Sequence, residues 1–156
     1  METNATSTSE RGTGKYLVLA DEGADGGALL ESLHQVIAQN RETTFVLLVP
    51  AKPAPRSLTW TEGESLAAAR DTANAASRRL QQAGIRVVEA LIGDASPVQA
   101  IADVLAQRGS FHGIIISTQP GRVSRWLKLD VLTIARKRFP LPVISANTPR
   151  EALATA

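Results

Sequence analysis

The sequence predicts an α/β fold: a doubly wound, five-stranded, mostly parallel sheet with helices on both of its faces. Short apolar runs rich in β-branched residues alternate with segments of helical period, which is the pattern of a parallel sheet covered by helices. The 156 residues suffice for one domain of ordinary size. Apolar residues make up 44% of the chain and charged residues 21%, a balance typical of globular proteins, so we expect a single folded domain.

Five strands are expected, and their composition indicates their places in the sheet. The first, second and fourth are almost continuous apolar runs, YLVLA, FVLLV and GIIIS, as expected of strands buried on both faces. The third includes Arg86 and Glu89 among its apolar residues, which suits an edge position. The predicted strands are residues 16–20, 45–49, 86–92, 113–117 and 142–145.

The first two predicted helices each show an apolar stripe of helical period. The first helix ends before the polar stretch at Asn40, and the second ends at Gly84, where a glycine favours a helix C-terminus. Residues expected to face inward in the first are Leu29, Leu30, Leu33, Val36 and Ile37. In the second, the inward residues are expected to be Leu66, Ala69, Ala73, Ala76, Leu80 and Ala83.

The last two predicted helices carry recognisable ends. Pro97 lies near the first turn of the third helix, with Asp94 or Ser96 as its cap. The fourth ends in a run of cations, residues 136–138, which is favourable at a helix C-terminus. Its inward residues are expected to be Leu127, Val131, Ile134 and Ala135.

The ends of the chain and the absence of cysteine indicate the cellular compartment of the protein. Residues 1–14 and 148–156 are expected to be mobile tails, which leaves residues 15–147 as the domain. The N-terminus lacks the apolar core of a signal peptide, and no apolar run approaches the roughly 20 residues that cross a bilayer. We therefore expect a cytoplasmic protein without disulfides, thiolate nucleophiles or a membrane partner.

Charge and motifs argue against nucleic-acid binding and catalysis. A net charge of +2 is too mild for a general nucleic-acid surface. The stretch GADGG at residues 23–27 lacks the spacing of a dinucleotide-binding loop. His34 and His112 are both expected away from the carboxyl edge of the sheet, where ligands of this fold class bind. We therefore expect no catalytic residues, no metal site and no enzymatic activity.

Polar residues follow several strands and should gather at one edge of the sheet. They include Asp21, Asp94, Ser117 and Thr118. A receiver domain of a two-component system would look somewhat similar, but it would need a second acid, a phosphoacceptor after the third strand and a lysine after the fifth. The basic residues Arg122, Arg125 and Lys128 start the fourth predicted helix and form either an anion site or a solvated face.

Three segments resemble universal stress proteins: KYLVLAD at residues 15–21, GDASPVQAI at 93–101, and the strand–loop–helix–strand unit at 114–145. The resemblance implies strand order 3-2-1-4-5, with a ligand crevice between the first and fourth strands. It also implies an adenine nucleotide as the one candidate cofactor. The residues that would bind the nucleotide are Asp21, Val49, Gly93, Ser117, Thr118, Gly121, Arg122, Ser124 and Arg125.

The chain departs from the ATP-binding motif of that family, G-x-x-G-x9-G-[ST]. The first glycine of the motif aligns with Ser117 of this chain, and the second aligns with Pro120 or Gly121. The final pair of the motif aligns with residues 129–130, Leu-Asp. A carboxylate where a hydroxyl would meet phosphate is repulsive, and proline removes a backbone donor. We expect ATP to bind weakly or not at all, and adenosine or a monophosphate to suffer less.

The resemblance to universal stress proteins also implies a function and an oligomeric state. It implies a non-enzymatic, stress-associated binding or regulatory protein with a degenerate nucleotide crevice, acting through an unidentified protein partner. The alternative is a module that senses ATP or AMP, and the receiver-like domain is a remote third. The resemblance further implies a homodimer, formed through the exposed edge of the short fifth strand.

Overall fold

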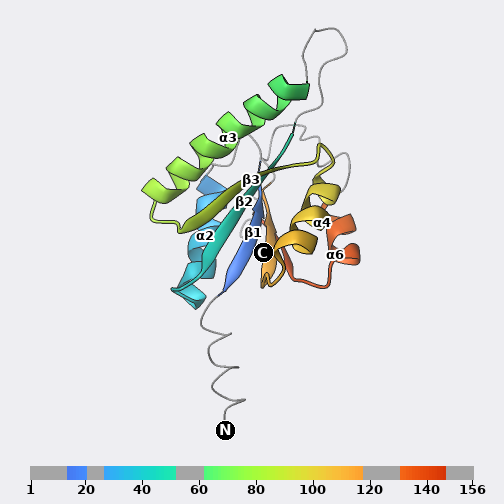
Figure 1. Ribbon diagram of the computed structural model, residues 1–156. Helices are drawn as coiled ribbons and strands as arrows, with labels where there is room; N and C mark the ends of the chain where they lie inside the picture. Colours follow the sequence, from blue (N-terminus) through green and yellow to red (C-terminus); the bar gives the residue numbers. More distant parts are fainter. Residues whose placement is uncertain (1–13, 21–26, 52–61, 118–130, 147–156) are drawn as a thin grey trace.

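The computed structural model describes residues 14–20, 27–51, 62–117 and 131–146 (Figure 1). Five strands and four helices alternate along these residues, and each strand agrees with its predicted range to within one residue at either end. The elements are β1 (Lys15–Leu19), α2 (Gly27–Gln39), β2 (Thr44–Pro50), α3 (Glu62–Gln82), β3 (Val87–Gly93), α4 (Pro97–Arg108), β4 (Gly113–Ile116), α6 (Val131–Arg138) and β5 (Val143–Ser145).

The sheet has the strand order β3-β2-β1-β4-β5. Both the order and the edge position predicted for the third strand are confirmed. All four strand pairs are parallel, so the sheet is wholly rather than mostly parallel. The order reverses between β1 and β4, because the chain builds outward from β1 to β3 and then returns to the other side of β1.

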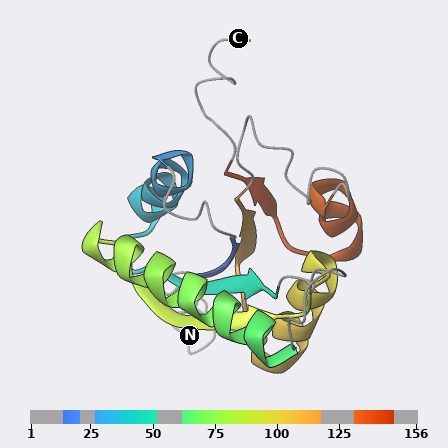
Figure 2. The ribbon, with the colours of Figure 1, turned by 90° about the horizontal axis from the view of Figure 1, so that it is seen from above.

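Two apolar cores lie on the two faces of the sheet. On one face, buried residues of β1, β2 and β4 pack against α2 and α3. On the other face, the alternate residues of the same strands pack against α4 and α6. Figure 2 shows α2 and α6 on opposite sides of β1 and β4. This double cover explains why the central strands are apolar at nearly every position.

Two residues predicted to face inward are exposed instead. Leu66 of α3 and Ile134 of α6 each have 43% of their surface exposed. A 21-residue helix is roughly 31 Å long, whereas a seven-residue strand spans roughly 23 Å, so the first turns of α3 extend past the sheet. In the short α6, Val131 and Ala135 form the buried stripe, which leaves Ile134 on its flank.

The N-terminus of α4 shows which of two candidate residues is the cap. The Ser96 hydroxyl accepts a hydrogen bond from the backbone N–H of Gln99, at 3.5 Å. The Asp94 carboxylate accepts one from the backbone N–H of Ser96, at 2.8 Å. Ser96 is therefore the N-cap, and Asp94 orders the turn before it.

We expect Ser96→Ala to lower the free energy of unfolding by about 0.5–1 kcal/mol, the lower part of the range for lost N-caps, because the Gln99 bond is long. Urea unfolding followed by circular dichroism measures this. Ser96→Asp keeps an acceptor at the same position and places negative charge at the helix N-terminus, so it should stay within about 0.5 kcal/mol of the parent. Equal losses in the two variants would contradict the assignment.

Candidate functional site

The carboxyl ends of β1 and β4 lie side by side at the point where the strand order reverses. Leu19 and Ile116 are register partners, and the backbone N–H of Ser117 donates to the Leu19 carbonyl at 2.9 Å. In open α/β sheets, ligands bind outside the carboxyl ends of the strands at such a reversal. This edge is therefore the candidate site.

A row of buried residues crosses the sheet at this edge. The Ala20 N–H donates to the Leu48 carbonyl at 3.0 Å, so Ala20 lies beside Val49 of β2. The bond from the Ser117 N–H to the Leu19 carbonyl places Ser117 on the other side of Ala20. Val49 and Ala20 belong to the core under α2 and α3, and Ser117 follows Ile115 of that core by two residues. Because side chains alternate along a strand, all three face the α2 side of the sheet.

Ser117 brings a polar group into this row. Ser117 is only 5% exposed. The other buried polar residues of the described part are Ser32, which lies within α2, and Thr43, which lies at the amino end of β2. Ser110 is the one non-glycine residue with positive φ in that part, so the backbone at Ser117 is not left-handed. The position aligned with the first motif glycine therefore accommodates a side chain, whose hydroxyl can donate to or accept from a ligand.

Gly93 lies further away and faces the other side of the sheet. It ends β3, which β2 separates from β1, so it is about 10 Å from β1 at ordinary strand spacing. A Cβ atom built on Gly93 would lie 2.6 Å from the Cβ of Ala100 in α4 and 2.9 Å from Leu48 Cδ1. The close approach of α4 to the sheet explains why this residue is glycine.

Of the nine predicted site residues, the structure therefore brings Val49 and Ser117 into one row and places Gly93 on the opposite face. The remaining six lie outside the described residues: Asp21, Thr118, Gly121, Arg122, Ser124 and Arg125. The motif positions 120, 129 and 130 lie outside them as well.

Sequence reasoning missed two small residues of the same row, Ala20 and Ala146. The Ala146 N–H donates to the Ile116 carbonyl at 2.9 Å, so Ala146 extends the row beyond Ser117, and both alanines are fully buried. The available signal was the small residue that follows the apolar runs of the first and fifth strands. Both alanines belong to the core on the α2 side of the sheet.

Neither histidine is among the residues that follow β1 and β4 at this edge. His34 is exposed on α2, and His112 is exposed at the opposite, amino end of the sheet, where its N–H donates to the Lys15 carbonyl at 2.8 Å. Within residues 14–20, 27–51, 62–117 and 131–146, no group of three or more His, Cys, Asp or Glu residues could hold a metal ion. None of the helices in these ranges is long and apolar enough to cross a membrane.

No protein-family model and no curated protein matches the sequence. Two solved structures match the fold. A universal stress protein from M. smegmatis, crystallised in complex with cAMP, is 14% identical, with a TM-score of 0.52, 85% of this chain covered and 95% of that chain. A universal stress protein from Archaeoglobus fulgidus is 16% identical, with a TM-score of 0.55, 85% of this chain covered and 92% of that one. The resemblance seen in the sequence is thus confirmed at the level of architecture, and the chain has the fold of the universal stress proteins.

Proposed function

We propose that this chain is a non-enzymatic, stress-associated binding protein of the universal stress protein family, whose crevice accepts an adenine mononucleotide in preference to ATP. The observation that carries the proposal is the buried residue Ser117, which has a hydroxyl group and lies beside β1 where the strand order reverses. A cAMP complex of a protein with the same fold supports an adenine mononucleotide as the ligand.

The preference follows from what the chain has in place of the ATP motif. A glycine lets the backbone approach a phosphate closely, and Ser117 stands where the first motif glycine would be. Asp130 stands where the motif has a hydroxyl, and a carboxylate repels phosphate. A triphosphate needs more of these contacts than a monophosphate, so the departures penalise ATP most.

We expect AMP or cAMP to bind at least about tenfold more tightly than ATP, a difference of about 1.4 kcal/mol. Isothermal titration calorimetry with the three nucleotides under one buffer measures it. Asp130→Ser with Leu129→Gly restores the final motif pair and should raise ATP affinity selectively. Micromolar ATP binding by the parent chain that is as tight as its binding of AMP and cAMP, and that Asp21→Ala abolishes, would contradict the proposed preference.

Removing the hydroxyl of Ser117 should weaken mononucleotide binding by about three- to tenfold, the effect of one neutral hydrogen bond. Ser117→Ala adds no bulk at this buried position, and Ser32→Ala is its matched control, since Ser32 is a buried serine within α2. Calorimetry with cAMP should show reduced affinity for the first variant only. A similar loss in both variants would assign the effect to general destabilisation.

We also infer that the chain catalyses no turnover of ATP. Incubation with labelled ATP should release neither phosphate nor adenylate above a buffer control. Release that scales with protein concentration and is lost in Ser117→Ala would instead favour an enzyme of the wider nucleotide-binding α/β class.

A homodimer through β5 is the second part of the proposal, and the contrast between the two sheet edges supports it. Strand β3 has an irregular register between Phe45 and Val46 of its neighbour, which leaves Val88 unpaired and 56% exposed. The side-chain amide of Gln81 donates to the Val87 carbonyl at 3.2 Å. Bulges and side-chain cover discourage pairing with another strand, so β3 is the protected edge.

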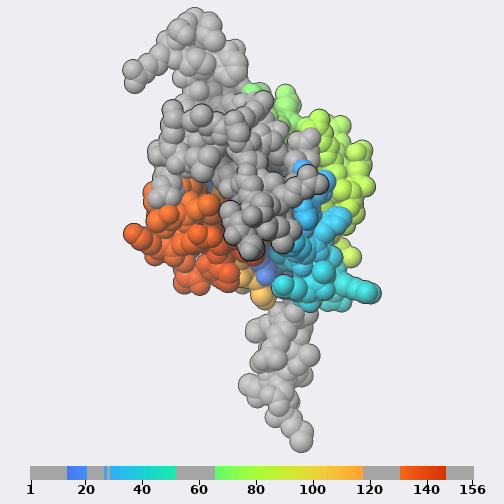
Figure 3. Space-filling view, turned by 180° about the vertical axis from the view of Figure 1, so that it is seen from behind, coloured from blue at the N-terminus to red at the C-terminus, as the bar shows by residue number. Residues whose placement is uncertain are grey.

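Strand β5 presents a regular edge. The Ile114 N–H donates to the Pro142 carbonyl, and the Ala146 N–H donates to the Ile116 carbonyl, both at 2.9 Å. In a parallel ladder with this register, Ile144 also bonds to β4, so the backbone groups of Val143 and Ser145 face outward. The outward backbone groups of Val143 and Ser145 therefore form the edge that a partner strand could use. Figure 3 shows the molecule from behind, with α6 on its left and α2 on its right. A second copy of β5 could pair there about a two-fold axis.

A further inference from the structure

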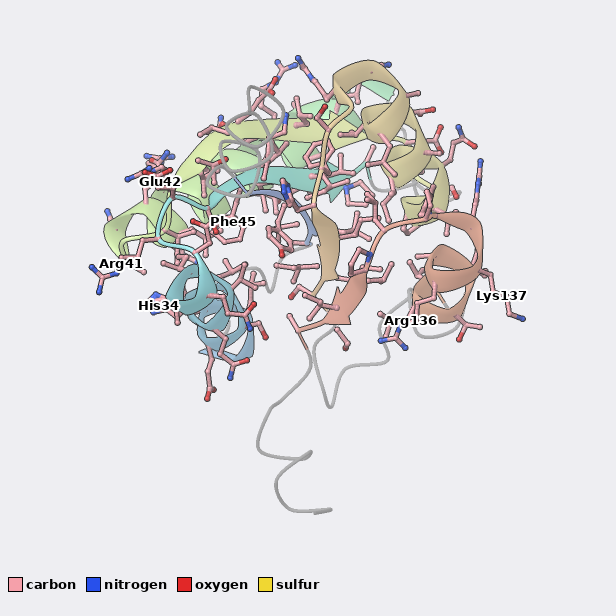
Figure 4. The ribbon with its side chains drawn as sticks, turned by 90° about the horizontal axis from the view of Figure 1, so that it is seen from below. His34, Arg41, Glu42, Phe45, Arg136 and Lys137 are labelled. Carbon is pink, nitrogen blue, oxygen red and sulfur yellow. The ribbon has the colours of Figure 1, made fainter. Side chains whose placement is uncertain are left out.

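One outward-facing carbonyl of β5 already has a hydrogen-bond donor within the same chain. Atoms Nε and Nη2 of Arg136, near the end of α6, both lie 3.4 Å from the Val143 carbonyl oxygen. Figure 4 shows Arg136 directed toward β5, whereas the neighbouring Lys137 points away from it. Arg136 thus covers the edge that the proposed dimer would use.

Pairing between two copies of β5 requires that same oxygen. In an antiparallel pair centred on Ile144, Val143 lies opposite the partner's Ser145, and each member of this hydrogen-bonded pair donates to and accepts from the other. The Val143 carbonyl would accept from the N–H of the partner's Ser145. An incoming strand must therefore displace the Arg136 guanidinium or share the carbonyl with it.

We propose that Arg136 regulates self-association: it covers the Val143 carbonyl in the monomer and opposes pairing of β5 with a second copy. The inference rests on the proposed homodimer. Both contacts are long, and the arginine is exposed, so the cover is weak and readily exchanged. Arg136 therefore shifts the equilibrium between monomer and dimer by a modest amount and does not block dimer formation. An anion that binds the guanidinium would free the Val143 carbonyl for a partner strand.

The chain offers a close pair of variants for the test. Arg136→Met removes the donors and the charge but keeps an unbranched side chain that suits a helix. Lys137→Met removes the same charge from the next residue of α6, for which no contact with Val143 is found. Any difference between the two variants reports the contact with the carbonyl rather than the net charge.

Sedimentation equilibrium of the full chain over a range of concentrations measures the dimer dissociation constant. We expect Arg136→Met to lower it by about fivefold, since one weak contact is removed from each of two chains. Lys137→Met should stay within about twofold of the parent. Chloride replaced by sulfate at equal ionic strength should tighten the parent dimer and leave Arg136→Met unchanged.

The outcomes separate this inference from the dimer itself. A parent dimer that Ser145→Pro dissociates, together with an unchanged or weaker dimer in Arg136→Met, would overturn the role of Arg136 and leave the β5 interface standing. A chain that stays monomeric in every variant, or a dimer insensitive to Ser145→Pro, would overturn both. Arg136→Met/Ser145→Pro should be monomeric if both hold, with thermal unfolding confirming that each variant is folded.

Discussion

Ser145→Pro should dissociate the proposed dimer while leaving the sheet intact. The Ser145 N–H faces away from β4, because in this ladder the N–H groups of Ile144 and Ala146 bond to β4. Proline therefore removes an outward donor without removing a ladder bond, as is tolerated on edge strands. Two hydrogen bonds are lost per dimer, which at about 1 kcal/mol each weakens association about thirtyfold.

Sedimentation equilibrium measures this change, and the other edge of the sheet provides the control. Val88 is exposed on β3, so Val88→Lys places a charge on that edge and should leave the dissociation constant unchanged. Thermal unfolding should show both variants folded. A folded Ser145→Pro that remains dimeric, or a dimer dissociated by Val88→Lys, would rule out β5 as the interface.

Gly93→Ala should lower the free energy of unfolding by about 1–3 kcal/mol, the usual cost of overpacking a core. The new methyl would meet Ala100 Cβ at 2.6 Å, and Ala100 Cα lies only 3.4 Å away. Neither atom can rotate aside, because both are fixed by the backbone of α4, so the helix itself must move. Urea unfolding measures the loss.

Gly27→Ala is the matched control for Gly93→Ala. A Cβ atom at Gly27, the first residue of α2, would meet nothing within 4 Å. This variant should be neutral or slightly stabilising, by up to about 1 kcal/mol, since alanine favours helices over glycine. If Gly93→Ala leaves the unfolding free energy unchanged but removes cAMP binding, the glycine serves a ligand rather than the packing of α4.

The fold was largely predictable, because its signals are local. Runs such as FVLLV and GIIIS are apolar on both faces, and only a strand covered on both sides buries all of them. The place of Ser117 at the carboxyl end of β4 was predictable for a similar reason, since it is the polar residue that ends such a run. The exposure of Leu66 was not predicted, because it depends on the length of α3 relative to the sheet beneath it.

Other features depend on contacts between residues that sequence patterns do not connect. The need for glycine at position 93 comes from the distance between α4 and the sheet. The unpaired Val88 comes from the register between β3 and β2. The contact between Arg136 and the Val143 carbonyl depends on how the connection after α6 turns back along the sheet. The charge run at 136–138 predicted a helix end but not this contact.

We propose that an adenine mononucleotide binds at the carboxyl ends of β1 and β4. The most direct test is a titration of isotopically labelled protein with cAMP, followed by the amide resonances in heteronuclear NMR spectra. We expect shifts at Ala20, Val49 and Ser117, with the amides of Lys15 and His112 at the opposite end of the sheet unchanged. Saturable shifts confined to Lys15 and His112, or no shifts at millimolar cAMP, would contradict it.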